Sequence, residues 1–444
     1  MENTRYRAVW NDRFSSGCCF VKVLFDISVL GLGYFSQRGR TGIYRAVEAL
    51  AGQLHQHKEI ELDFSAIRST VTLSKAACYL EDSCSPFCGV RLVEPCQAAG
   101  RCLARLNRTL LHAPLPLALH SVLAGLDRLE RLFLPGQALP HPVSMNSYDI
   151  FHSTFYPLPP ASPKGPRRLL TVYDLIPLLF PEYTRKNEQQ AVRASLNSIG
   201  PEDLVIAISE ATKNDLCTFT GIAPERVFVT RLAASGRFFP QPDAKLQEAV
   251  RARHHIPDGP YLLSLGTLEP RKNIPAVIRS FAKLVRQEHL HDLNLVLVGT
   301  KGWLYSEIFE QIETMKDLRE RIIVTGYVDD ADLAPLYSGA SMFIYPSLYE
   351  GFGLPPLEAM QCGIPVITSN TSSLPEVVGD AGLLVDPRDE DALCQAIFDI
   401  YRKPSLAAEL AARSCARAAR FSWNRCADET VAAYRMAALQ RGVA

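Results

Sequence analysis

The sequence predicts an α/β protein with two doubly wound parallel sheets, and three observations support that fold class. Short apolar runs that end in glycine or polar residues alternate with helix-forming segments along most of the chain. The 444 residues exceed the ~250–300 at which a single hydrophobic core stops growing, so at least two domains are expected. Hydrophobic residues make up 47% and charged residues 21%, as in ordinary globular domains.

The front half contains five candidate strands, each a short apolar run with a polar end. They cover residues 21–30, 149–156, 167–175, 203–210 and 225–233. Residues 41–54 form a predicted helix that is entered through the glycines between Gly39 and Gly42. Residues 210–221 form another, closed by Gly221. This alternation predicts the first parallel sheet.

Residues 240–259 separate two sets of strands. They lack strand patterning and are flanked by proline and glycine, which predicts an interdomain linker. Six candidate strands follow at residues 261–269, 293–302, 321–328, 341–347, 363–370 and 382–387, and residues 404–442 are predicted to be helical. We therefore expect an N-terminal domain (1–240), a C-terminal domain (241–405) and helices (406–444) that pack back on the body. Ligands are expected in the cleft between the sheets.

Charge and hydropathy limit the cellular compartments and the binding partners that we expect for this protein. Lysine and arginine total 47, as do aspartate and glutamate, so the net charge is zero and nucleic acid is not an expected partner. Residues 1–240 carry 26 basic and 21 acidic side chains, which suits an anionic membrane face or a phosphorylated acceptor but also fits ordinary scatter. With no signal peptide and no run of about 18 uncharged apolar residues, we expect a cytoplasmic protein, which can still contact a membrane.

The 12 cysteines do not indicate a metal site. Five of them cluster in sequence: Cys78, Cys84, Cys88, Cys96 and Cys102. None of these forms a Cys-x-x-Cys pair, and no histidine has zinc-ligand spacing to them. Reduced thiols are therefore favoured.

Residues 101–134 are rich in leucine and arginine. Three leucines share one helical stripe and three arginines accompany it: Leu103, Leu106, Leu110, Arg101, Arg105 and Arg108. Basic amphipathic helices lie on anionic membranes in some proteins, whereas a core-facing helix with solvated arginines has the same pattern. The sequence leaves both interpretations open.

The segment 349–370 carries the strongest functional signal. Glu350 follows a predicted strand, and Gly351 and Gly353 allow a tight turn close to a ligand. The two prolines that follow suit the first turn of a helix, whose free N–H groups bind phosphate. Glu350 and Glu358 can accept hydrogen bonds from sugar or ribose hydroxyls. A helix-capping role would explain Glu358 alone, but not the whole segment.

The segment 264–275 adds two cations. Gly266 ends a strand near the expected cleft, and Arg271 and Lys272 stand just before a helix that starts near Asn273. That placement suits an anionic diphosphate. A solvated surface pair is the alternative, and the glutamate segment favours the functional interpretation.

Together these segments resemble the family 4 retaining glycosyltransferases, which have the GT-B fold of two Rossmann-like domains. The resemblance covers residues 20–435 and is strongest from Tyr261 to Pro387. It is closest to bacterial mannosyltransferases that build O-antigen-type polysaccharides. The phrases DIFHSTFYPLP, TVYDLIPL and VIAISEATKNDL resemble the corresponding phrases of those enzymes.

The resemblance implies a role for each candidate residue. Glu350 would contact the donor sugar, His152 the donor sugar or its leaving oxygen, and Asp174 the acceptor side. Glu358 would bind the ribose, and Gly42 would belong to a glycine loop that lets donor or acceptor approach. The remaining implied donor-binding residues are Gly266, Thr267, Arg271, Lys272, Gly351, Phe352, Gly353 and Leu354.

Two positions depart from the family's pattern. Thr267 stands where many members have arginine, and Tyr173 stands where many have histidine before the aspartate. The chain also contains Asp330-Ala-Asp332, a spacing that holds a divalent ion in other glycosyltransferases. Here it is typical of a capped helix start, and Lys272, Arg271 and a helix N-terminus can stabilise the departing charge instead.

The expected activity is retaining transfer of a hexose from a nucleotide sugar to a glycan or lipid-linked oligosaccharide in polysaccharide biosynthesis. Mannose from GDP-mannose is implied by resemblance only, and no cofactor or metal is expected. A nicotinamide-dependent oxidoreductase is the first alternative, because Gly31 and Gly33 follow a strand, but the third glycine of that fingerprint is absent. A catalytically inactive, sugar-binding scaffold is the second, although the candidate catalytic residues are all present.

Overall fold

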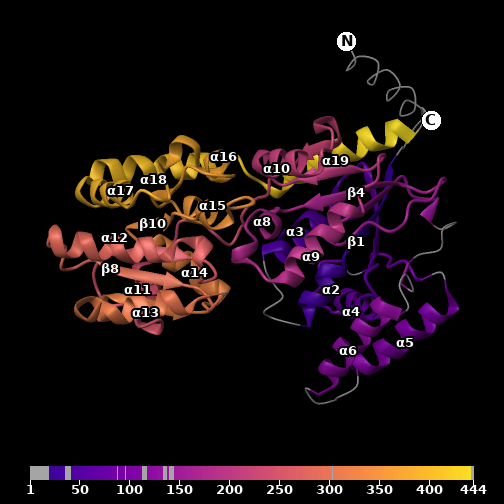
Figure 1. Ribbon diagram of the computed structural model, residues 1–444, viewed down its shortest axis with the longest axis horizontal. Coiled ribbons are helices and arrows are strands. Elements are labelled where there is room, and N and C mark those ends of the chain that lie inside the picture. Colours follow the sequence, from indigo (N-terminus) through magenta and orange to yellow (C-terminus); the bar gives the residue numbers. More distant parts are fainter. Residues whose placement is uncertain are drawn as a thin grey trace, which may run out of the picture.

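The computed structural model describes residues 20–35, 42–87, 89–95, 97–112, 118–133, 138–139, 145–302 and 304–441. The chain forms two lobes, each built around a six-stranded parallel sheet flanked by helices (Figure 1). This confirms the predicted fold class of two Rossmann-like domains.

The N-terminal sheet has the order β2-β1-β3-β4-β5-β6. Its strands are β1 (Val21–Asp26), β2 (Ile60–Ser65), β3 (Ile150–Ser153), β4 (Arg167–Val172), β5 (Leu204–Ala207) and β6 (Val227–Val229). All are parallel. The central strands β3 and β5 are buried along their whole length, as expected for a parallel sheet covered on both faces.

Eight α-helices surround this sheet in the described part of the chain. They are α2 (Ser28–Tyr34), α3 (Gly42–Gln56), α4 (Thr70–Glu81), α5 (Ala98–His112), α6 (Ala118–Phe133), α8 (Ile176–Leu179), α9 (Lys186–Asn197) and α10 (Glu210–Thr220). Helix α10 ends at Gly221, which adopts the left-handed conformation (φ 71°), as the sequence predicted. Gly39, the other glycine of the predicted helix entry, lies outside the described residues.

The C-terminal sheet has the order β12-β11-β10-β7-β8-β9. Its strands are β7 (Tyr261–Leu265), β8 (Asn294–Val298), β9 (Ile322–Gly326), β10 (Met342–Tyr345), β11 (Val366–Ser369) and β12 (Leu383–Val385). The helices of this lobe are α11 (Ala244–Arg253), α12 (Ile274–Gln287), α13 (Ser306–Thr314), α14 (Asp330–Ser338), α15 (Leu354–Gln361), α16 (Leu374–Val378), α17 (Glu390–Arg402) and α18 (Pro404–Ala418). The six strands predicted here are all present.

The last helix joins the two lobes. Helix α18 packs on α15 and α17, whereas α19 (Trp423–Arg441) returns to the N-terminal lobe and packs on α3 and on the sheet (Figure 1). Val431 and Tyr434 of α19 are fully or almost fully buried there. The C-terminal helices therefore pack on both domains.

The predicted strand at residues 21–30 is too long. The strand ends at Asp26, whose Oδ1 accepts a hydrogen bond from Ser28 Oγ (2.7 Å), and α2 begins at once. Gly31 lies inside α2, where a Cβ atom would stand 2.6 Å from the backbone nitrogen of Ala76 on α4. Gly31 therefore serves helix packing. Because both Gly31 and Gly33 lie inside α2 rather than in a turn after the strand, the feature that suggested an oxidoreductase is absent.

Two further elements differ from the sequence prediction. Strand β2 was missed, because Glu61 and Asp63 interrupt its apolar pattern. The predicted linker at 240–259 contains α11, which packs on α14. The chain there is thus part of the C-terminal lobe rather than a free connection.

Two further expectations from the sequence concern membrane-spanning helices and the cysteines. In the described part of the chain no helix is both long enough and apolar enough to cross a membrane. The described cysteines form no disulfide, and Cys88 and Cys96 lie outside the described residues.

Candidate active site

A cavity of about 410 Å³ lies between the two lobes. Its walls come from loops at the carboxyl ends of parallel strands, where such sheets bind ligands. Asp174 follows β4 of the N-terminal lobe, whereas Thr267 and Arg271 follow β7 of the C-terminal lobe. The structure thus brings the predicted acceptor and donor sides to one cleft.

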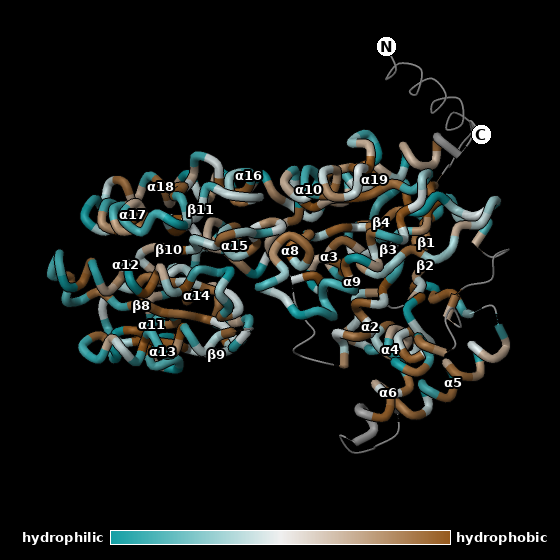
Figure 2. The backbone as a smooth tube through the Cα atoms, in the orientation of Figure 1, coloured by the Kyte–Doolittle hydropathy of each residue, from teal (hydrophilic) through white to brown (hydrophobic). Residues whose placement is uncertain are grey.

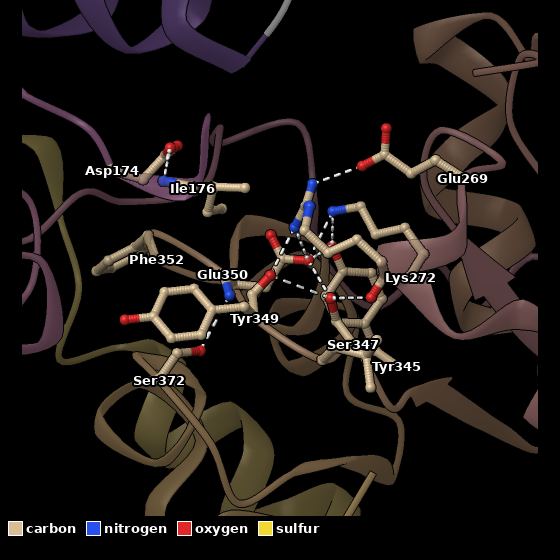
Figure 3. Close-up of polar contacts among 12 residues, drawn as sticks. Asp174, Ile176, Glu269, Lys272, Tyr345, Ser347, Tyr349, Glu350, Phe352 and Ser372 are labelled. Carbon is tan, nitrogen blue, oxygen red and sulfur yellow. Dashed lines mark hydrogen bonds and ion pairs between the residues drawn. The ribbon is translucent and has the colours of Figure 1, made fainter. Parts of the chain in front are cut away.

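Glu350 follows β10 and is the centre of a buried polar network (Figure 3). Its Oε1 accepts hydrogen bonds from Ser347 Oγ (2.6 Å) and Tyr345 Oη (2.9 Å). Lys272 Nζ lies 2.7 Å and Arg271 Nη1 2.9 Å from the same oxygen. Burial alone would raise the pKa of Glu350, but the two cations outweigh it and hold the pKa at about 2. Glu350 is therefore ionised, and its Oε2 has no hydrogen-bond partner among the described residues.

Arg271 and Lys272 lie in one turn of 3-10 helix before α12. Asn273 follows in the left-handed conformation (φ 57°), and its side-chain amide donates to the carbonyls of Pro346 (3.1 Å) and Pro387 (2.7 Å). These bonds fix the turn against the loop after β10. Burial lowers the pKa of Lys272, the neighbouring guanidinium lowers it further, and the glutamate opposes both effects. The two cations are thus held inside the cleft.

The glycine turn after Glu350 reaches across the cleft. A Cβ atom on Gly351 would lie 2.5 Å from the Tyr173 carbonyl and 2.9 Å from Asp174 Cβ, so only glycine fits. Gly353 (φ 123°) precedes Leu354, the first residue of α15. Because the next two residues are prolines, the backbone N–H groups near Gly353 and Leu354 are the donors at this helix start.

Gly42 and Phe352 flank the same turn. Gly42 begins α3, and a Cβ atom on it would lie 3.6 Å from Leu354 Cδ1, so Gly42 lies close to the start of α15. Phe352 is 5% exposed and packs edge-on against Phe421, with ring centroids 6.0 Å apart. Its side chain therefore supports the turn, and only its backbone is available to a donor.

Glu358 lies one turn further along α15. Tyr337 Oη donates a hydrogen bond to its Oε2 (3.0 Å). Burial raises the pKa of Glu358 to about 7, and the Tyr337 bond only partly opposes the shift. Glu358 is thus a carboxyl group that titrates near neutral pH at the donor side.

Gly266 and Thr267 form the turn after β7. A Cβ atom on Gly266 would lie 3.6 Å from Lys272 Cε, which places this turn beside the buried cation. The turn also touches the loop after β8, where a Cβ atom on Gly299 would overlap the Gly266 carbonyl and one on Gly302 would lie 2.5 Å from Thr267 Cγ2. These two glycines were not recognised in the sequence.

Asp174 lies on the opposite wall (Figure 3). Its Oδ1 accepts a hydrogen bond from the Ile176 N–H (3.0 Å). Burial raises the pKa of Asp174, and the positive charge of Arg271 partly opposes the rise. Asp174 and Arg271 line the same cavity, so the predicted acceptor-side residue lies opposite a predicted donor-side cation.

His152 does not join this group. It is fully buried in β3, where Nδ1 lies 2.6 Å from Tyr434 Oη and Nε2 lies 2.7 Å from Thr171 Oγ1. Burial lowers the pKa of His152 to about 3, so the ring is neutral. With both ring nitrogens engaged and no exposed surface, His152 does not fit the predicted contact with the donor sugar. It ties α19 to the sheet instead.

Asp330 and Asp332 each pair with cations. Asp330 begins α14, as predicted, and accepts a hydrogen bond from Arg45 Nη2 (2.5 Å) across the cleft. Asp332 pairs with Arg253 (2.5 Å) and with His254 (2.9 Å). The helix-start interpretation agrees with this geometry, and the ion pair between the lobes was not anticipated from the sequence.

Comparisons with known proteins identify the family of the chain. The family described as Glycosyl transferases group 1 matches residues 247–417. The O-antigen chain mannosyltransferase B of Escherichia coli is 34% identical over 325 residues, which cover 71% of this chain and 84% of that protein. The serotype-specific mannosyltransferase WbdA of Escherichia coli is 32% identical over 277 residues, or 61% of this chain, but the match spans only 34% of that longer protein.

Solved structures support the fold. Sucrose-phosphate synthase from Thermosynechococcus elongatus superimposes with a TM-score of 0.64 over 94% of this chain and 98% of its own, at 20% identity. The cleft residues and the extent of the sequence match therefore establish that the chain belongs to the group 1 glycosyltransferases and is a glycosyltransferase close to O-antigen mannosyltransferases.

Proposed function

We propose that the protein transfers mannose from GDP-mannose to a glycan or lipid-linked oligosaccharide, with retention of configuration and without a metal ion. The observation that carries the proposal is the placement of Lys272 and Arg271 on Glu350 in the cleft. The mannosyltransferase names of the relatives support the choice of sugar.

The donor diphosphate is the natural ligand of the two cations. Its oxygens would share Lys272 Nζ and Arg271 with Glu350 Oε1 and would accept hydrogen bonds from the backbone N–H groups at the start of α15. These fixed donors stabilise the charge of the departing diphosphate in a site that largely excludes water. That electrostatic contribution replaces the usual work of a divalent ion.

The two glutamates and Asp174 position the reactants. Glu350, ionised because of its cations, accepts hydrogen bonds from the sugar hydroxyls through Oε2. Glu358 accepts a ribose hydroxyl through Oε1, because Tyr337 occupies only Oε2. Asp174 lies across the cleft and orients the acceptor hydroxyl. The acceptor attacks from the face that the diphosphate leaves, and a phosphate oxygen takes its proton, so no protein nucleophile is needed.

A melting experiment tests the donor. GDP at about 100 times its dissociation constant should stabilise the protein by roughly 2.7 kcal/mol, and the shift should persist in EDTA. UDP and ADP should give smaller shifts. A shift with UDP only, or one abolished by EDTA, would overturn the assigned nucleotide or the metal-independent mechanism. Analysis of the product anomer by NMR after transfer from GDP-mannose tests retention.

The affinity for GDP should depend on pH through Glu358. Because burial raises the pKa of Glu358 to about 7, the carboxylate that accepts the ribose hydroxyl is lost as the pH falls below 7. We expect affinity to fall by up to roughly tenfold per pH unit below that point. Isothermal titration at several pH values measures it.

The Glu358→Gln variant is the control for that titration. GDP itself also gains protons in this range, and the variant experiences the same change. At pH 8 the variant should bind GDP more weakly than the wild type does. Its affinity should change with pH only through protonation of the GDP phosphate. Parallel pH profiles for the two proteins would rule out Glu358 as the titrating group.

A further inference from the structure

Helix α6 buries its acidic side chains and exposes most of its described large apolar ones, the reverse of the usual arrangement in a surface helix. Its two acidic residues face the body of the protein: Asp127 Oδ1 accepts a hydrogen bond from Ser69 Oγ (2.5 Å), and Glu130 binds the N–H (2.7 Å) and hydroxyl (2.6 Å) of Thr70. Both acids are only 8% exposed. The buried face of α6 therefore carries both of its acids, together with Leu123 (1% exposed).

The apolar face of α6 points to solvent. Its exposed side chains are Val122 (52%), Leu126 (40%), Leu129 (53%), Leu132 (66%) and Phe133 (74%). Four of them recur at helical spacing and form a continuous stripe. Figure 2 shows α6 at the outer edge of the N-terminal lobe, with hydrophobic stretches along its backbone. Such a stripe on a helix held by specific polar bonds indicates a partner.

The charge of the neighbourhood indicates what that partner is. Within α5 and α6 the basic side chains are Arg101, Arg105, Arg108, Arg128 and Arg131. The only acids of the two helices are the inward-facing Asp127 and Glu130. Arg108 pairs with Glu81 of α4 and Arg131 pairs with Asp127, so the exposed Arg105 and Arg128 carry the excess positive charge beside the apolar stripe. Positive charge next to exposed apolar side chains suits an anionic lipid surface. A second copy would bring the same positive charge to the contact.

An apolar groove links this surface to the active site. The groove encloses about 1020 Å³, and its lining is mainly apolar, with Ile67, Phe155 and Val172 among its residues. Arg131 of α6 and Asp174 of the cleft both line it. A groove of this kind suits an acceptor whose hydrocarbon part remains in a bilayer while its sugar reaches Asp174.

We propose that the exposed stripe of α6 inserts into the interface of an anionic phospholipid bilayer, with the arginines of α5 and α6 at the headgroups. The hydrocarbon chains cover the leucines and Phe133, and the groove opens beside them toward the cleft. The link to a lipid-anchored acceptor rests on the proposed function, whereas membrane binding itself does not depend on it.

Vesicle sedimentation tests the proposal. The protein should bind vesicles of phosphatidylcholine containing phosphatidylglycerol, and it should bind pure phosphatidylcholine more weakly. The double variant Leu129→Glu/Phe133→Glu should lose at least roughly tenfold in binding, because both side chains leave hydrocarbon. Arg128→Glu should weaken binding only to the anionic vesicles, by roughly fivefold or more.

Phe219→Glu on α10, at a side chain that is 42% exposed, is the matched control and should bind like the wild type. The GDP-induced melting shift of each variant shows that fold and donor site are intact, so failure of the nucleotide assignment is seen separately. No binding by the wild type, or equal binding by the double variant, would overturn the proposal. Self-association that the double variant abolishes, without vesicle binding, would assign the stripe to a second copy instead.

Discussion

Replacing Lys272 with alanine is expected to lower the turnover number by roughly 10²–10³-fold, the usual cost of losing one fixed charge-stabilising donor. Lys272 Nζ lies 2.7 Å from Glu350 in the free site and is the buried cation available to the leaving diphosphate. Arg271 still neutralises Glu350, so the fold should persist. Initial rates over a range of GDP-mannose concentrations separate the effect on kcat from that on KM.

Lys283→Ala is the matched control, because Lys283 lies on α12, is exposed and pairs only with Asp391 in the described structure. It should retain full activity. Lys272→Arg should recover part of the rate, since it keeps the charge but places a larger fork in a pocket shaped for an ammonium group. A Lys272→Ala enzyme with unchanged kcat would remove Lys272 from the chemistry.

The grouping of the predicted donor-site residues could be inferred from the sequence because its signals are local. Glu350, the glycine turn and the start of α15 are consecutive, and Arg271 and Lys272 adjoin the turn after β7. Each lies where a parallel strand ends, so the sheet alone brings them together. The close contact between Gly351 and Tyr173 could not be predicted, because the two residues belong to different lobes and are far apart in sequence.

The errors have the opposite origin, since they depend on distant partners. The sequence cannot show that Gly31 packs inside a helix against Ala76 of α4, or that the acids of β2 lie at a sheet edge. The pattern of residues 101–134, with its leucine stripe in what is now α5, matched both a core helix and a membrane helix. Only the bonds of Asp127 and Glu130 to α4 and to the residue before it show which face of α6 is inside. The same holds for His152 at the end of its strand, because the sequence does not show whether its ring contacts a ligand or is hydrogen-bonded inside the fold.

Replacing His152 with alanine should therefore lower stability rather than donor binding. The free energy of unfolding should fall by roughly 3–5 kcal/mol, because Tyr434 Oη and Thr171 Oγ1 lose their buried partner and a cavity opens beside Phe25. Urea unfolding measures the loss. The affinity for GDP, measured well below the melting temperature, should remain that of the wild type.

The pH dependence of the free energy of unfolding below neutral pH provides a second, independent test of this role of His152. Burial lowers the pKa of His152 from 6.5 to about 3. Between pH 6.5 and pH 3, the imidazole is therefore protonated in the unfolded chain and neutral in the folded one. The stabilisation from neutral His152 is complete above pH 6.5 and is lost as the pH falls toward 3, at up to about 1.4 kcal/mol per pH unit. A His152→Gln variant should lack this component of the wild-type slope. If that variant instead keeps the slope and loses turnover, His152 acts on the donor after all, and the buried arrangement must open during catalysis.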